Sequence, residues 1–265
     1  MDKALKAIRR TAQYTYEYFK YLGIFSALAY LITVAFRVLG KSRFIITDKI
    51  PIVLATRFGS VVCTFEDLSV LWEIFCKKCY RFWGRPRVVI DIGAHIGIFT
   101  LYIKKLYPSA RVVAIEPHPL SFKLLRWNVR LNNLTDVNLL PLALSSRTGV
   151  LKLLTGFRWK GSATTVLGIA KRLAKQYMRS VGVRTTTLDS LVRALRITRI
   201  DLIKIDVEGA ELDVLKGGIE TLHKTRELVI AAYHTPTEAD EVEIFLKRHG
   251  FDVRRYLVGE AVYLH

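Results

Sequence analysis

Carboxylate side chains stand at the ends of three short apolar runs in this chain. Asp91 follows the run Val-Val-Ile at 88–90, Glu116 follows the run at 112–115, and Asp206 follows the run at 202–205. Runs rich in β-branched residues favour strands, and open α/β sheets bind ligands beyond the carboxyl ends of their strands. A carboxylate placed there can accept hydrogen bonds from ribose hydroxyls or take a proton from a reacting group. We therefore expect these acids at one ligand-binding edge of a sheet.

A glycine-containing turn follows the first of these acids. Gly93 and Gly97 are separated by Ala-His-Ile, and an apolar segment that can begin a helix comes next. A dinucleotide site requires Gly-x-Gly-x-x-Gly, and this chain lacks that spacing. The pattern Asp-x-Gly-x-x-x-Gly resembles the first motif of S-adenosylmethionine (SAM) methyltransferases. The alternative is an ordinary strand–turn–helix of another α/β protein.

The third acid belongs to the run Lys-Ile-Asp-Val-Glu-Gly-Ala-Glu at 204–211. Clustered acids repel one another, so one of them can have a raised pKa and act as a base. We expect Asp206 to have this functional role, and Glu211 to cap the first turn of a helix. His234 follows the apolar run at 229–233 and is the other candidate base, with an ordinary loop histidine as the alternative.

The composition indicates a basic protein with a substantial core. The chain has 265 residues, of which 51% are hydrophobic, and its net charge is +18. Such a balance predicts attraction to nucleic acid, anionic lipid or a phosphorylated substrate. The odd cysteine count argues for a reducing compartment, and Cys76 and Cys79 have redox or zinc spacing but sit in a helical pattern. We expect structural thiols and no metal site.

The N-terminal region contains an uncharged run at 21–36 between Lys20 and Arg37. As a helix it would be about 24 Å long, which is short of the ~30 Å hydrocarbon core of a bilayer. Three interpretations remain: a packing helix, a helix anchored in the membrane plane, and a single span. The expected location is cytoplasmic, peripheral or anchored to a membrane through residues 14–39.

The order of the predicted elements indicates an α/β fold. The chain is expected to begin this order with a hairpin, whose turn is at Gly59-Ser60, and a helix at 65–79. Alternating strands and helices follow. The strands are expected at 88–91, 112–116, 137–141, 202–206 and 228–233, and the helices at 98–106, 120–131, 211–223 and 238–249. This order predicts a mostly parallel sheet with helices on both faces, and a C-terminal hairpin at 251–254 and 261–264 compatible with one antiparallel edge strand.

A basic insertion at 142–200 interrupts this order. It is expected to hold a hairpin of 150–154 with 183–187 and a helix within 157–180 that carries Lys171, Lys175 and Arg179. The predicted divisions are an N-terminal helical segment at 1–42, a hairpin-plus-helix cap at 43–82 and a SAM-binding domain at 83–265.

Several motifs together resemble the FkbM-type SAM-dependent methyltransferase family, over roughly residues 60–264. They are Asp-x-Gly-Ala-x-x-Gly-x-x-Thr from 91, Glu-Pro at 116, Ala-Leu-Ser at 143, Thr-Leu-Asp-Ser-Leu at 187 and the run at 204–211. The resemblance implies a class I Rossmann-like fold and methyl transfer, usually to a hydroxyl oxygen of a sugar, polyketide or other secondary metabolite. It implies SAM contacts from Asp91, Gly93, His95, Gly97, Glu116 and Ala143, and places Asp206 and Glu208 beside the transferring methyl group. The family more often has Asn where this chain has His95.

The function expected from these observations is O-methylation of a sugar, a lipid-linked glycan or another small metabolite. Asp206, Glu208 and His234 are the candidate catalytic residues, and SAM is the cofactor. An anionic membrane surface is an expected partner. The alternatives are an RNA methyltransferase that uses the basic insertion and a non-catalytic membrane-associated scaffold.

Overall fold

The computed structural model describes residues 2–24, 27–28, 31, 51–64, 67–155, 179–258 and 261–265. The chain forms two compact units, each made of segments distant in sequence. The helical unit comprises Met1–Cys79, Ile96–Pro108 and Lys123–Thr135, and the sheet unit comprises Tyr80–His95, Ser109–Phe122 and Asp136–His265.

The helical unit contains the predicted N-terminal hairpin. Its elements are α1 (Asp2–Leu22), β1 (Ile52–Thr56), β2 (Gly59–Cys63), α3 (Leu68–Leu71), the π-helical turn η4 (Trp72–Cys76), α4 (Ile98–Leu106) and most of α5 (Pro119–Leu131). The hairpin is confirmed, but its turn is Arg57-Phe58 and not Gly59-Ser60. The side chain of Thr56 stabilises this turn, because its Oγ1 accepts from Phe58 N at 3.1 Å and donates to Gly59 O at 2.6 Å.

The predicted helix at 65–79 appears as α3 followed by η4. Glu17 of α1 holds η4 through Trp72, whose Nε1 donates to Glu17 Oε2 at 2.6 Å. All three cysteines are free thiols, and burial raises the pKa of Cys76 to about 12. A thiol with so high a pKa is a poor nucleophile, which supports the structural role expected for Cys76.

Most of the uncharged run at 21–36 lies outside the described residues, and α1 ends at Leu22. Among the helices in the described part of the chain, none has the length and apolar composition needed to cross a membrane.

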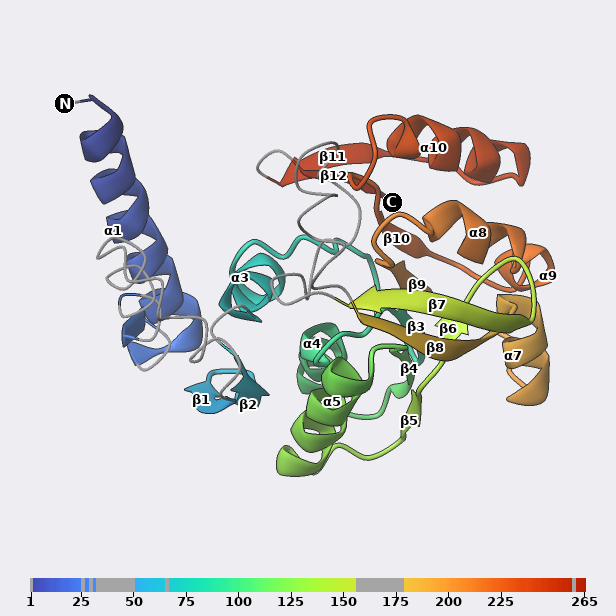
Figure 1. Cartoon of the computed structure of the whole chain (residues 1–265), viewed down its shortest axis with the longest axis horizontal. Helices are drawn as coiled ribbons and strands as arrows, with labels where there is room; N and C mark the ends of the chain where they lie inside the picture. Colours follow the sequence, from blue (N-terminus) through green and yellow to red (C-terminus); the bar gives the residue numbers. More distant parts are fainter. Residues whose placement is uncertain are drawn as a thin grey trace. The chain divides into compact units, whose positions relative to one another are not determined.

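The sheet unit is built on seven strands (Figure 1). In spatial order they are β11 (Arg255–Val258), β12 (Ala261–Leu264), β10 (Leu228–Ala231), β9 (Leu202–Ile205), β3 (Val88–Ile92), β4 (Arg111–Ile115) and β5 (Val137–Leu140). The five strands from β10 to β5 are parallel, as predicted, and each agrees with its predicted range within two residues at either end.

The C-terminal hairpin joins this sheet differently from the expectation. Its antiparallel strand, β12, lies between β10 and β11 and not at the edge. Burial explains this order, because Tyr263 and Leu264 of β12 are 1% and 0% exposed, whereas Arg255 and Leu257 of β11 are exposed. The more apolar strand therefore takes the interior position, and the strand with exposed side chains forms the edge.

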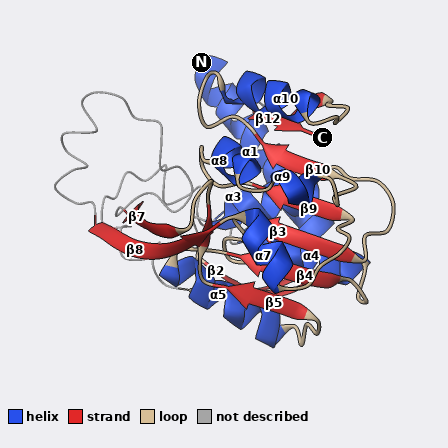
Figure 2. Cartoon of the chain, turned by 90° about the vertical axis from the view of Figure 1, so that its right-hand side faces the viewer, coloured by secondary structure: helices blue, strands red, loops and turns tan. Residues whose placement is uncertain are grey.

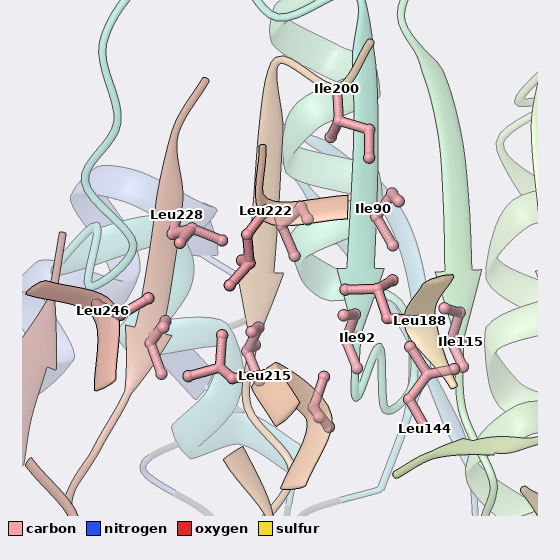
Figure 3. Packing of buried hydrophobic residues seen from close by; sticks show 14 of the residues in the cluster. Ile90, Ile92, Ile115, Leu144, Leu188, Ile200, Leu215, Leu222, Leu228 and Leu246 are labelled. Atoms are coloured by element: carbon pink, nitrogen blue, oxygen red, sulfur yellow. The ribbon is translucent and has the colours of Figure 1, made fainter. Parts of the chain in front are cut away.

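One face of the sheet carries the apolar core of this unit (Figure 3). Ile90, Ile92, Ile115 and their neighbours pack there against side chains from the helices α7 (Leu188–Ala194), α8 (Glu211–Lys216), α9 (Ile219–Leu222) and α10 (Glu238–Arg248). The single helix predicted at 211–223 is thus two helices, interrupted at Gly217-Gly218, where glycine disfavours helix continuation. The rigid sheet and its core hold the strand ends at which the predicted acids lie.

The insertion adds a three-stranded sheet in the order β6 (Ala143–Leu144), β8 (Arg179–Thr186), β7 (Gly149–Thr155). Figure 2 shows β7 and β8 side by side. The antiparallel pairing of β7 with β8 confirms the predicted hairpin. The predicted helix within 157–180, with Lys171 and Lys175, falls almost entirely outside the described residues, and Arg179 is the first residue of β8.

Candidate active site

The glycine turn after β3 is hydrogen-bonded to β4 and packs against the residue that follows β9. The backbone N–H groups of Gly93 and Ala94 both donate to Ile115 O of β4, at 3.0 and 2.9 Å. Gly93 has φ +74°, and a Cβ at this position would lie 1.8 Å from the carbonyl oxygen of Asp206. Only glycine fits here. This close packing brings the predicted cofactor turn directly against the predicted catalytic acid.

His95 occupies the left-handed region of the same turn, with φ +52°. Asn, Asp and His are the side chains most often found there apart from glycine. This explains why His can stand where the family more often has Asn. Gly97, the last glycine of the motif, is the N-cap of α4 with φ +90°.

Glu116 is the first residue after β4, and it is 6% exposed. Its Oε2 accepts from the backbone N–H of His95 and its Oε1 from that of His118, both at 2.8 Å. Burial raises the pKa of Glu116, although His95 and the two backbone donors favour the carboxylate. Each carboxylate oxygen has a second lone pair, so Glu116 can also accept hydrogen bonds from the ribose hydroxyls of SAM. The contact itself remains a prediction.

A buried ion pair joins β3 and β9. Asp91 and Lys204 are register partners on these strands, and Lys204 Nζ lies 3.3 Å from Asp91 Oδ1. Lys204 Nζ also donates to Gly93 O at 2.6 Å and lies 3.9 Å from Asp206 Oδ2. Burial alone would lower the pKa of Lys204, but Asp91 and Asp206 raise it. The lysine is therefore charged, and it links the glycine turn to Asp206.

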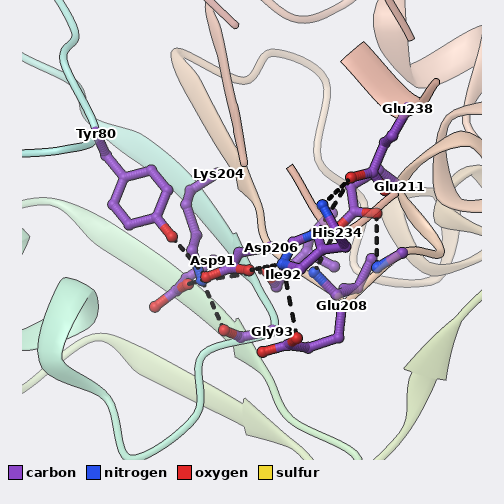
Figure 4. Close-up of polar contacts among 12 residues, drawn as sticks. Tyr80, Asp91, Ile92, Gly93, Lys204, Asp206, Glu208, Glu211, His234 and Glu238 are labelled. Atoms are coloured by element: carbon purple, nitrogen blue, oxygen red, sulfur yellow. Dashed lines mark hydrogen bonds and ion pairs between the residues drawn. The ribbon is translucent and has the colours of Figure 1, made fainter. Parts of the chain in front are cut away.

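Asp206 follows β9 directly, and its side chain is 25% exposed (Figure 4). The Tyr80 hydroxyl donates to Oδ2 at 2.6 Å, and His234 Nε2 lies 3.6 Å from Oδ1. The carboxylate thus lies between a tyrosine hydroxyl and a histidine ring. Asp206 has the exposure, the hydrogen-bonding capacity and the position that a proton acceptor needs.

His234 is buried among four carboxyl groups. Its Nδ1 lies 3.2 Å from Glu238 Oε2 and 3.4 Å from Glu211 Oε1, and its Nε2 lies 3.6 Å from both Asp206 Oδ1 and Glu208 Oε2. Burial acts to lower the pKa of His234, but Glu238 and the other carboxylates raise it to about 9. An imidazolium cannot accept a proton, so the arrangement favours Asp206 over His234 as the base.

Glu211 is fully buried and shapes the turn that carries Glu208. Its two carboxyl oxygens accept from Val207 N at 2.8 Å and Gly209 N at 2.9 Å. These bonds hold Glu208 at φ +59°, a left-handed conformation that costs about 1–3 kcal/mol and needs such support. Burial raises the pKa of Glu211 to about 9, so the acid with the raised pKa is this structural one.

Donor atoms of Asp206, Glu211 and His234 lie within 4.8 Å of one another, a spacing that a metal ion can bridge. Both Glu211 oxygens already accept hydrogen bonds from backbone N–H groups, and His234 Nδ1 lies 3.2 Å from Glu238 Oε2. We therefore assign this group to the ion-pair network around His234.

The structure brings most of the predicted residues together. Asp91, Gly93, His95 and Glu116 form one connected group, and Asp206, Glu208 and His234 form another, with Lys204 linking the two. Ala143 lies apart from these contacts in β6, paired with Thr185 of β8. Sequence reasoning missed roles for Tyr80, Lys204 and Glu238. A lysine inside an apolar strand was a visible signal for Lys204, but no local pattern marks Tyr80.

The fold and the site define a class of enzyme. A mostly parallel seven-stranded sheet has a glycine turn after β3, an acid after β4 and an acidic cluster after β9 and β10. This is the class I Rossmann-like fold of SAM-dependent methyltransferases.

Comparison with known proteins leads to the same class of enzyme. A family model described as the methyltransferase FkbM domain matches residues 91–253, and the chain belongs to this family. It is 34% identical over 221 residues to methyltransferase sdnD of Sordaria araneosa, covering 73% of this chain and 85% of that protein. It is 30% identical over 213 residues to 31-O-demethyl-FK506 methyltransferase FkbM of Streptomyces tacrolimicus, covering 68% and 80%.

Among solved structures, a precorrin-6y C5,15-methyltransferase from Geobacter metallireducens aligns with a TM-score of 0.43 at 17% identity, over 76% of this chain and 86% of that chain. The protein is a methyltransferase, and its cofactor is SAM.

Proposed function

We propose that this methyltransferase modifies a hydroxyl oxygen of a small-molecule or glycan acceptor, with Asp206 as the proton acceptor. The observation that carries the proposal is the Asp206 carboxylate, which is partly exposed at the end of β9 and contacts Tyr80, Lys204 and His234. The name of the Streptomyces relative, a 31-O-demethyl-FK506 methyltransferase, supports transfer to oxygen.

The chemistry follows from the nature of the acceptor. SAM, when bound, supplies a methyl group on a sulfonium centre. A neutral hydroxyl is a weak nucleophile unless a base takes its proton. In this scheme the acceptor oxygen bonds to the methyl carbon while its proton passes to Asp206. Glu208, whose side chain is 31% exposed, offers a second carboxylate that can orient the acceptor by hydrogen bonding.

The charges around Asp206 suit this role. Lys204 and His234 lie 3.9 and 3.6 Å from its two oxygens, and both are cationic at neutral pH. Opposite charges attract, so both cations help to hold this carboxylate in place. Glu116 and the glycine turn at Gly93 would hold the cofactor. Because Gly93 packs against the backbone of Asp206, the cofactor turn and the proposed base are adjacent.

The test is the variant Asp206→Asn. We expect its SAM affinity, measured by isothermal titration, to stay within about twofold, and its turnover to fall about 10²-fold or more, as for loss of a general base. The matched control is Asp213→Asn, which makes the same change at an exposed position of α8. Near-normal turnover of a folded Asp206→Asn enzyme would exclude the proposed role.

The acceptor class needs a separate experiment. Radiolabelled SAM is incubated with the enzyme and with separate glycan, lipid, small-metabolite and RNA fractions. Label that enters a glycan or small-metabolite fraction and resists mild alkali supports a methyl ether. Label that enters only RNA, or that alkali releases as from a methyl ester, contradicts the proposal.

A further inference from the structure

Tyr80 reaches the candidate base from outside the part of the chain that defines the family. It precedes β3, whereas the family model matches residues 91–253. Tyr80 is 6% exposed, and its hydroxyl donates to Asp206 Oδ2 at 2.6 Å, within hydrogen-bond distance for O–H···O (Figure 4).

Other side chains fix the ring of Tyr80. It meets Tyr263 of β12 edge-on, with ring centroids 5.5 Å apart and planes at 89°, and Lys204 Nζ lies 5.3 Å from its centroid. Edge-to-face pairs and cations over aromatic faces are favourable contacts. The direction of the hydroxyl is therefore set by packing on two strands and does not depend on Asp206 alone.

The backbone after Tyr80 is anchored as well. Arg81 N donates to the Tyr256 hydroxyl of β11 at 3.1 Å, and Trp83 N donates to Glu227 Oε1 at 2.6 Å. Further along, Arg87 N donates to Asp201 Oδ2 at 2.8 Å. Each anchor belongs to β11 or to the residue just before β9 or β10. The segment that carries Tyr80 is thus tied to the sheet that carries the acid.

We infer that Tyr80 is a positioning residue for methyl transfer, which orients the Asp206 carboxylate. The inference rests on the proposed role of Asp206 as base. The terminal torsion of an aspartate is soft, so a carboxylate turns easily towards its strongest partner. Lys204 and His234 stand on either side, at 3.9 and 3.6 Å. The short bond from Tyr80 holds Oδ2 and keeps the carboxylate from turning fully into either ion pair.

The test is Tyr80→Phe, which removes the hydroxyl and keeps the ring against Tyr263 and Lys204. We expect kcat to fall about 10- to 100-fold, since misplacement of a catalytic group by about 1 Å costs about 10²-fold. The KM for SAM should change by less than about twofold. The acid limb of the pH–rate profile should move to higher pH, because a hydrogen bond to the charged form of an acid favours that form.

The matched control is Tyr107→Phe, which removes the hydroxyl of a half-buried tyrosine directly after α4 and leaves every group that the proposal invokes unchanged. It should leave kcat and the pH profile close to those of the wild type. If Tyr80→Phe does not fold, 3-fluorotyrosine at position 80 replaces it, because this analogue keeps both ring and hydroxyl and donates more strongly. The acid limb should then move to lower pH.

The outcomes separate the two proposals. The role of Tyr80 is overturned if Tyr80→Phe keeps the wild-type kcat and acid limb while Asp206→Asn is inactive. Asp206 then remains the base. An unmoved limb with fluorotyrosine also overturns the role of Tyr80. Near-normal activity in both Tyr80→Phe and Asp206→Asn overturns the proposed function itself.

Discussion

The ion pair between Lys204 and Asp91 predicts a large and unequal cost when either partner is removed. Their side chains are 4% and 0% exposed, so neither charge can be hydrated where it lies. Lys204→Met leaves the Asp91 carboxylate buried without its cation and removes the donor to Gly93 O, and we expect the free energy of unfolding to fall by about 3–5 kcal/mol. Asp91→Asn should cost less, about 1–3 kcal/mol, because Lys204 keeps Gly93 O and Asp206 as partners.

The assay is urea unfolding of both single variants and of the double variant, followed by circular dichroism. The double variant should lose less stability than the sum of the two singles, with a coupling of about 0.5–3 kcal/mol for residues in contact. Lys216→Met, at an exposed position of α8, is the control and should change stability by about 0.5 kcal/mol or less. Additive effects, or a loss below about 1 kcal/mol in Lys204→Met, would refute the reasoning.

Three further changes test other features. Glu116→Gln places an amide N–H₂ group against one of the two backbone N–H donors that Glu116 now binds. SAM affinity measured by titration should therefore fall about tenfold or more, and an unchanged Kd would contradict this. The pKa values of Glu211 and His234 are raised to about 9, from ordinary values of 4.5 and 6.5. A raised pKa in the folded state stabilises the protein at low pH, and this stabilisation is lost as pH rises from the ordinary value to the raised one. The free energy of unfolding should therefore drop between pH 6.5 and 9, and less so in His234→Gln; equal profiles would exclude this. We also propose that α1 contributes to binding of anionic membranes through Tyr16 and Phe19, which are 61% and 51% exposed. The protein should float with anionic vesicles at low salt, less so after Tyr16→Ser and Phe19→Ser, and sedimentation of the wild type would contradict this.

Local patterns were sufficient to predict the strands and the acids that follow them. Runs of β-branched residues mark β3, β4 and β9, and a carboxylate after such a run interrupts the apolar pattern where the strand ends. Glu116 and Asp206 accordingly lie one residue beyond β4 and β9. The helix at 98–106 was also predicted to its observed bounds.

Contacts between distant segments could not be predicted in the same way. Whether Lys204 faces Asp91 depends on the register of β9 against β3, which no single strand specifies. Gly93 was expected to admit a ligand, yet the backbone of Asp206 already requires glycine there. The charge of His234 depends on four carboxyl groups that only the folded chain brings together.

The interior position of β12 has a consequence for the order in which the sheet is assembled. β11 is synthesised before β12, but it can reach the sheet only through β12, which pairs with β10 on its other side. Adjacent strands lie about 4.8 Å apart, so β11 lies about 10 Å from β10 in the finished sheet. It cannot pair with the sheet until β12 has been inserted between them. On a ribosome, β10 therefore keeps an open edge until β12 has emerged. We expect the β11–β12 hairpin to dock as one piece, and a nascent chain stalled before residue 261 to expose that edge to chaperones or to other chains.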